Sequence, residues 1–131
     1  VASARAVPRG NERILIVDDE TEIAATYRRY LIRLGYQVEA YTAPLVALER
    51  FRANPSHYDL LISDILMPDM DGGDLARAMR GLRDDLPVIF CTGYNLNTIA
   101  LPDPPPVVMN KPVAPDDLAR HMRVMLDGRS A

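Results

Sequence analysis

Residues 14–20 read Ile-Leu-Ile-Val-Asp-Asp-Glu, four apolar residues followed at once by three carboxylates. A short β-branched run that is apolar throughout is typical of a strand buried on both faces, as in a parallel sheet. Similar runs with a polar end occur at residues 59–64, 87–92 and 107–111. The stretch at 14–20 therefore indicates the fold class and also the places where polar side chains collect.

Between these strands, apolar residues recur at helical spacing, as in Ile23, Tyr27 and Leu31. The spacing predicts helices over residues 21–34, 44–52, 74–82 and 116–126, with a further strand over 36–41. Residues 67–73 are predicted to form a loop because of their Pro, Asp and Gly content. This alternation predicts an α/β fold, a doubly wound five-stranded parallel sheet with helices on both faces.

The length of 131 residues and the composition are those of one globular domain. Hydrophobic residues make up 48% and charged residues 25%, which excludes wholesale disorder. We expect a linker or tail over residues 1–12, the folded domain over 13–127 and a C-terminal tail over 128–131. The start at Val1 rather than Met suggests an excised fragment or a processed start.

Charge and hydropathy limit the expected partners and location. The net charge is -3 and the basic residues are scattered, so we expect no binding to nucleic acid or to a membrane surface. No apolar run reaches the ~20 residues that span a bilayer, and no signal-peptide pattern is present. The single cysteine, Cys91, cannot form an internal disulfide, which fits a reducing cytoplasm.

The basic residues are unevenly divided, because all of them are Arg except one, Lys111. Codon bias toward Arg explains why lysine is scarce, but it does not explain why one lysine is kept at this position. A requirement for a compact ammonium at position 111 would explain it, since Arg and Lys are not interchangeable where one point charge is needed.

The polar residues that end the predicted strands are expected to meet at one edge of the sheet. They are Asp18 and Asp19 after the first strand, Asp64 after the third, Thr92 after the fourth and Lys111 after the fifth. Three carboxylates close together repel one another unless a cation lies among them, and hard oxygen ligands suit Mg²⁺. A metal site, an ammonium, a hydroxyl and a carboxylate nucleophile are the groups needed for phosphoryl transfer to an aspartate.

Each of these features is ordinary when taken alone. Asp-Asp after a strand is commonly a helix cap, a single Asp is commonly a turn former, and Thr-Gly and Lys-Pro are common in loops. The prediction depends on their joint occurrence in this order, each at the end of a different strand.

The same residues carry a resemblance to a known family. The sequence resembles the response-regulator receiver domains of two-component signalling systems in four motifs over residues 13–127: ILIVDDE at 14–20, DLLISDILMPDMDG at 59–72, PVIFCTGY at 87–94 and NKP at 110–112. The resemblance implies a flavodoxin-like fold with strand order 2-1-3-4-5.

The resemblance also implies roles at the phosphorylation site. Asp64 would accept the phosphoryl group, and Mg²⁺ would be held by Asp18, Asp19 and Asp64 with the backbone carbonyl of Leu66. The phosphodonor would be a phospho-histidine on a histidine kinase or a histidine phosphotransfer domain.

The resemblance implies roles for two further residues, one during transfer and one after it. Lys111 would contact the phosphoryl oxygens, and Thr92 would move to donate a hydrogen bond to the phosphoryl group. The peptide bond before Pro112 would be cis, as X-Pro bonds permit.

Two features depart from the family pattern. Val108 stands where members of the family often carry a switching aromatic residue, so either the aromatic half of the switch is missing or another residue such as Tyr94 takes a related part. Four prolines, at 102 and 104–106, predict that the fourth helix is shortened or missing and that the output face is atypical.

Leu66 and Tyr94 are poorly suited to positioning an attacking water, which predicts slow self-dephosphorylation.

Two other functions are compatible with such a fold. One is an interaction module that signals without phosphate, against which the complete set of strand-end residues argues. The other is a Mg²⁺-dependent phosphohydrolase with an aspartyl nucleophile, which would need an acid where this chain has Leu66.

The motifs at 9–20 and 91–94 resemble those of the C-terminal receivers of hybrid sensor histidine kinases. The lack of room for an effector domain after residue 127 agrees with this expectation. His57 and His121 lack the surroundings of a phospho-histidine site and are interpreted as ordinary surface residues.

Overall fold

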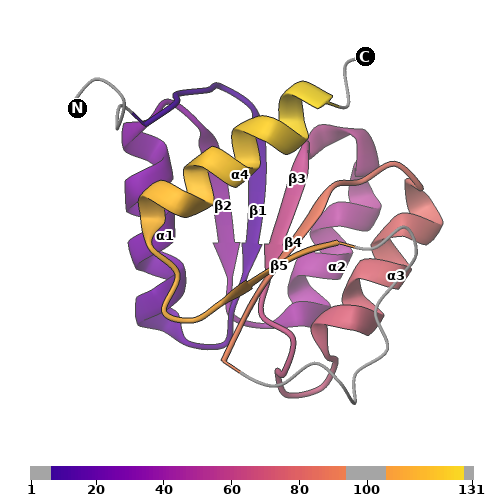
Figure 1. Ribbon diagram of the computed structural model, residues 1–131. Helices are drawn as coiled ribbons and strands as arrows, with labels where there is room; N and C mark the ends of the chain where they lie inside the picture. Colours follow the sequence, from indigo (N-terminus) through magenta and orange to yellow (C-terminus); the bar gives the residue numbers. More distant parts are fainter. Residues whose placement is uncertain (1–6, 94–105, 129–131) are drawn as a thin grey trace.

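The computed structural model describes residues 7–93 and 106–128, in which five strands and four α-helices alternate (Figure 1). The strands are β1 (Arg13–Val17), β2 (Gln37–Tyr41), β3 (Leu60–Ser63), β4 (Val88–Thr92) and β5 (Val107–Asn110). The helices are α1 (Thr21–Arg33), α2 (Pro44–Ala53), α3 (Gly72–Leu82) and α4 (Pro115–Gly128), with a short 3-10 helix, η2 (Pro55–His57). The predicted elements are confirmed, with bounds that differ by one or two residues.

The five strands form one parallel sheet in the order β2-β1-β3-β4-β5, as the resemblance implies. In the register, Ile16 of β1 lies between Ala40 of β2 and Ile62 of β3. The strands β1, β3 and β4 are buried, apart from Arg13 at the start of β1, whereas the edge strands β2 and β5 are only partly buried.

Helices cover both faces of the sheet, α1 and α4 on one and α2 and α3 on the other (Figure 1). Successive residues of β1 point to opposite faces, so Ile14 and Ile16 pack under α1 and α4 while Leu15 and Val17 pack under α2 and α3. Each such side chain stabilises the fold by about 2 kcal/mol when it is fully buried. The apolar strands therefore contribute side chains to two hydrophobic cores, one on each face of the sheet.

Helix α3 begins at Gly72, two residues before the predicted start at Asp74. The carboxylate of Asp71 accepts a hydrogen bond from the Asp74 N–H at 2.8 Å, which caps the helix N-terminus and allows the two preceding glycines to join the first turn. The Asp-Gly-Gly stretch, read as a loop from its composition, is thus a cap followed by a helical turn.

Some expectations fall outside the described residues. These are the shortened or missing fourth helix and the part assigned to Tyr94, both of which lie within residues 94–105. Over the described ranges, no helix combines the length and the apolarity that crossing a bilayer requires.

Residues 9–12, ahead of β1, are hydrogen-bonded to the body of the domain. The Gly10 N–H donates to the Leu34 carbonyl at 3.1 Å, and the Gln37 N–H donates to the Glu12 carbonyl at 3.0 Å. Gly35 has a φ of +105°, and a Cβ on it would lie 2.4 Å from the Gly10 carbonyl oxygen, so glycine is required there.

An ion pair fastens this segment to α4. The Arg123 guanidinium bonds both carboxylate oxygens of Glu12, at 3.0 Å between Nη1 and Oε1, and it also donates to the Arg9 carbonyl. Both side chains are mostly buried, with 21% of Arg123 and 17% of Glu12 exposed. The hydrogen bond from Arg123 lowers the pKa of Glu12 below its ordinary value.

This lowered pKa makes the stability of the fold depend on pH in a defined direction. The carboxylate binds protons more weakly in the folded chain, so the ion pair stabilises the fold at neutral pH and loses this effect as the pH falls through the lowered pKa. We predict that Glu12→Gln reduces the free energy of unfolding by about 1 kcal/mol at pH ~7, measured by urea unfolding, and that this difference shrinks as the pH falls below the ordinary pKa of a glutamate.

Glu49→Gln is the matched control, because Glu49 pairs with Arg52 on the exposed surface of α2. It should change the unfolding free energy little at neutral or acidic pH. A difference between wild type and Glu12→Gln that stays constant with pH would contradict the assignment.

Candidate functional site

Backbone hydrogen bonds place the predicted site residues at one edge of the sheet. The Asp18 N–H donates to the Tyr41 carbonyl at 3.1 Å and the Asp64 N–H to the Val17 carbonyl at 3.0 Å. The Lys111 N–H donates to the Thr92 carbonyl at 2.8 Å. These bonds extend the ladders one residue beyond the strands, so the side chains that follow β1, β3 and β5 start from fixed positions.

The Lys111 ammonium lies among three carboxylates. Its Nζ is 3.0 Å from Asp18 Oδ2, 3.0 Å from Asp64 Oδ2 and 3.3 Å from Glu20 Oε1. The side chains of Asp18 and Asp64 are nearly buried, at 4% and 6% exposed, whereas that of Glu20 is 59% exposed. The single lysine of the chain therefore neutralises the negative charge of two carboxylates that are nearly buried at this edge of the sheet.

Each of the two buried carboxylates is held at both oxygens. Asp18 Oδ1 accepts the Glu20 N–H at 2.9 Å, and Asp64 Oδ1 accepts the Ile65 N–H at 2.7 Å. The second oxygen of each carboxylate faces Lys111. Backbone on one side and ammonium on the other fix how both carboxylates are oriented.

The pKa shifts of Asp18 and Lys111 follow from burial and from the contacts between them. Burial raises the pKa of Asp18 above its usual range, and the hydrogen bonds from the Glu20 N–H and Lys111 only partly offset this. Burial alone would lower the pKa of Lys111, but the hydrogen bonds to Asp64 and Asp18 outweigh it and raise that pKa above its ordinary value. The ammonium stays charged, while the carboxylates would gain from a further cation.

A pocket of about 550 Å³ opens over this cluster; it is lined by Asp19, Glu20, Asp64, Leu66, Gly93 and Lys111. Asp19 and Leu66 thus lie where the sequence places them, although Asp19 is exposed. Sequence reasoning missed Glu20, although it directly follows Asp19 in the first motif. Glu20 is visible in the sequence as the third acid of the Asp-Asp-Glu stretch. Its contact with Lys111, however, depends on the turn that leads into α1, which the sequence pattern does not specify.

Three other predicted residues lie behind or away from the pocket. Thr92 is fully buried at the end of β4, directly before Gly93. Val108 lies on β5 opposite Phe90 and packs into the core under α2 and α3, and the peptide bond before Pro112 is cis, as expected.

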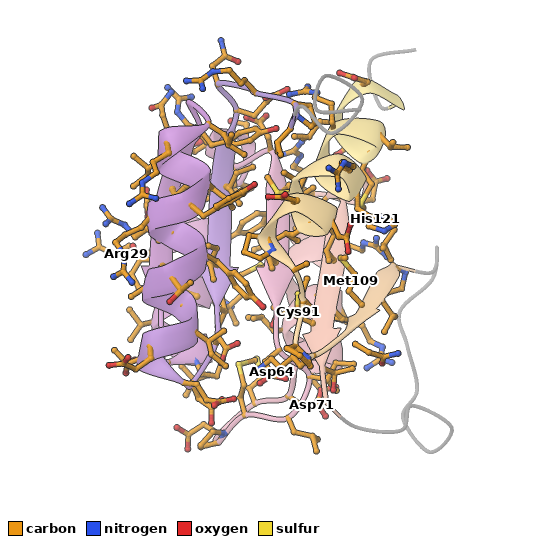
Figure 2. The ribbon with its side chains drawn as sticks, turned by 60° about the vertical axis from the view of Figure 1, so that its left-hand side comes forward. Arg29, Asp64, Asp71, Cys91, Met109 and His121 are labelled. Carbon is orange, nitrogen blue, oxygen red and sulfur yellow. The ribbon has the colours of Figure 1, made fainter. Side chains whose placement is uncertain are left out.

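The two histidines lie apart from the site. Figure 2 shows Asp64 at the lower end of the sheet, with Asp71 close to it, whereas His121 lies on α4 away from this end. His121 is exposed, as expected for a surface residue. His57 is only half-buried rather than fully exposed, because it packs edge-on against the ring of Tyr58 and lies 3.6 Å from Glu39.

The close approach of α3 to the Asp64 backbone depends on one glycine. A Cβ on Gly72 would lie 2.1 Å from the Asp64 carbonyl oxygen, and the Gly72 N–H donates to the Ile65 carbonyl at 2.6 Å. Gly72 therefore lets the start of α3 close the loop that carries Asp64.

The donor atoms of this site fit a hard divalent cation. Carboxylate oxygens of Asp18, Glu20 and Asp64 lie within 4.8 Å of one another, and Asp19 lines the same pocket. Oxygen donors of this kind, with room for water beside them, are what Mg²⁺ prefers in proteins.

Comparison with known proteins identifies similar chains. A sequence model of the response regulator receiver domain matches residues 14–123. The response regulator MprA of Mycobacterium tuberculosis is 32% identical over 117 residues, which cover 87% of this chain and 50% of that protein. The response regulator receiver protein CpdR of Brucella abortus is 31% identical over 118 residues, which cover 88% of this chain and 97% of that protein.

A solved structure agrees with these matches. The receiver domain of the hybrid histidine kinase CckA superposes with a TM-score of 0.77 at 32% identity, covering 87% of this chain and 98% of that one. The chain spans about half the length of MprA, so the match to that protein concerns one part of it.

Two glycines of α3 give a paired test of the loop that carries Asp64. We predict that Gly72→Ala lowers the free energy of unfolding by about 1–3 kcal/mol, because the new Cβ overlaps the Asp64 backbone, which cannot move aside as a flexible side chain would. Gly81→Ala should instead raise it by up to ~1 kcal/mol, because nothing lies within 4 Å of a Cβ on Gly81 and alanine favours the helix.

Urea unfolding of both variants beside wild type gives the comparison. Equal stability of Gly72→Ala and wild type would contradict the close approach of α3 to the Asp64 backbone.

Proposed function

Because the chain belongs to the response regulator receiver domain family, we propose that it accepts a phosphoryl group on Asp64 in two-component signalling. The observation that carries this proposal is the Lys111 ammonium, which lies 3.0 Å from both Asp18 and Asp64 and lines the same pocket as Asp64. A nearly buried carboxylate beside a fixed cation and open to a pocket is arranged for attack on an anionic group.

The proposed reaction transfers the phosphoryl group from a phospho-histidine to Asp64. A bond forms between a carboxylate oxygen of Asp64 and phosphorus while the phosphorus–nitrogen bond of the donor breaks. The electron pair of that bond stays on the imidazole nitrogen, so Asp64 reacts as a carboxylate and gives up no proton. The residues of the site position the two reactants and neutralise charge.

Asp18, Asp19 and Asp64, with the backbone carbonyl of Leu66, are the groups proposed to hold Mg²⁺. A bound Mg²⁺ would neutralise charge on the transferring phosphoryl oxygens. The support for this assignment is the oxygen donor set and the positions of Asp19 and Leu66 on the same pocket. Asp18 already has one oxygen fixed by the Glu20 N–H, so its other oxygen keeps one orientation.

Lys111 and Thr92 are proposed to recognise the phosphoryl group. The ammonium is within reach of any group on Asp64, because it already contacts that carboxylate. Thr92 is buried at the end of β4. A shift of its hydroxyl toward the phosphoryl group would make this strand end a two-state element that reports phosphorylation.

The surroundings of Asp64 favour a stored phosphoryl group over rapid turnover. Leu66 lines the pocket, is 44% exposed, and its side chain offers no group to activate water. The same residue stands where an aspartyl phosphohydrolase would need an acid. We therefore propose slow self-dephosphorylation.

We propose that the phosphodonor is a histidine kinase or a histidine phosphotransfer domain. We also propose that the domain is located in the cytoplasm. The similarity to the CckA receiver favours an origin in a hybrid histidine kinase. CpdR, matched over 97% of its own length, represents the alternative, a receiver that forms nearly the whole protein.

Labelling with a small phosphodonor tests the acceptor directly. With Mg²⁺ and radiolabelled acetyl phosphate, wild type should become labelled, and removal of Mg²⁺ with a chelator should prevent this. Asp64→Asn should reduce the label to background, because an amide cannot attack phosphorus as a carboxylate does.

Asp71→Asn is the matched control in the same loop. Asp71 caps α3, and asparagine caps helices equally well, so this variant should keep both its fold and its label. Persistent labelling of Asp64→Asn would contradict the assignment of Asp64 as the phosphoryl acceptor. Decay of the wild-type label within seconds would contradict slow self-dephosphorylation.

A further inference from the structure

Glu20 is the third partner of the Lys111 ammonium, and its contact differs from the other two. Its Oε1 is 3.3 Å from Nζ, compared with 3.0 Å for each aspartate. Its side chain is 59% exposed, whereas those of Asp18 and Asp64 are nearly buried. Glu20 therefore closes the ring of acceptors around the ammonium from the solvent side.

An ammonium has three N–H donors, and Lys111 has three carboxylate partners. A phosphoryl oxygen can gain a hydrogen bond from this nitrogen only if one of the three partners gives up its own. The Glu20 contact is the longest and the most screened by water, so it costs the least to break. The two aspartate contacts lie in the nearly buried part of the cluster and are retained.

We propose that Glu20 is a positioning residue that occupies the third N–H of Lys111 in the resting domain and yields it to a phosphoryl oxygen. This inference rests on the proposed phosphorylation of Asp64. It makes Glu20 a competitor of the incoming phosphoryl group, so the residue weakens the binding of an anionic phosphodonor without taking part in bond formation.

The backbone of Glu20 is fixed independently of its side chain. Its N–H donates to Asp18 Oδ1 at 2.9 Å, and its carbonyl accepts the N–H groups of Ile23 and Ala24 at the start of α1. The carboxylate makes no capping hydrogen bond to the helix. Glu20→Gln therefore keeps the turn into α1 and removes only the charge that faces Lys111.

The single lysine of the chain allows this contact to be observed alone. Protein labelled with ¹³C and ¹⁵N in lysine gives one side-chain ammonium signal by NMR, that of Lys111 Nζ, and this is the signal compared between variants. In the resting protein, the Lys111 signal of Glu20→Gln should differ from that of wild type. With Mg²⁺ and beryllofluoride, a phosphoryl mimic, the two signals should coincide, because the third N–H then bonds fluorine in both proteins.

The kinetics should show the same competition. With acetyl phosphate and saturating Mg²⁺, the acetate group leaves with the electron pair of the broken phosphorus–oxygen bond as the bond from Asp64 to phosphorus forms. Glu20→Gln should lower KM for acetyl phosphate about two- to fivefold, the range of an exposed ion pair, with kcat unchanged.

Glu22→Gln is the control for the loss of one negative charge. Glu22 is an exposed carboxylate in the first turn of the same helix, and it lines a neighbouring groove together with Glu20 and Lys111. This variant should leave the resting Lys111 signal and KM close to those of wild type.

Several results would overturn the proposal. They are a resting Lys111 signal unchanged by Glu20→Gln, a difference that persists with beryllofluoride, equal effects of Glu22→Gln, or a tenfold loss of Mg²⁺ affinity that makes Glu20 a metal ligand. Failure of wild type to take label would instead refute the proposed function, whereas a labelled wild type with an unaltered Glu20→Gln refutes only this inference.

Discussion

The arrangement of the whole site depends on one interaction, the contact of the Lys111 ammonium with two nearly buried carboxylates. Asp18 and Asp64 lie at the ends of buried strands, where water can solvate little of their charge. Burying charge without a partner is costly, so a cation must stand between them. Lysine supplies that cation as a single nitrogen, 3.0 Å from each carboxylate.

The fold provides this contact through the geometry of its parallel sheet. The ladders run one residue beyond β1, β3 and β5, which brings the following side chains to the same edge. Gly72 lets α3 close on the loop after Asp64, and the Thr92 carbonyl receives the Lys111 N–H. The pocket at this edge is therefore a product of sheet register as much as of the polar residues themselves.

Sequence reasoning succeeded where backbone position alone determines the outcome. Strands that end in polar residues share an edge in a parallel sheet, so Asp18, Asp64 and Lys111 could be brought together from the pattern. Glu20 was missed because its reach depends on the turn into α1, which strand periodicity does not encode. The early start of α3 was missed for a similar reason, since the cap by Asp71 overrides the loop composition of the glycines.

The central claim, that position 111 requires a compact ammonium, is tested most directly by phosphorylation of Lys111→Arg. Three acceptors converge on one nitrogen in a side chain that is 15% exposed, and a planar guanidinium cannot place a single atom there. We expect a folded variant, verified by its circular dichroism and thermal unfolding, whose rate of label uptake from acetyl phosphate falls at least about tenfold. Uptake at the wild-type rate, with the same conformational response, would show that lysine at this position is an accident of composition.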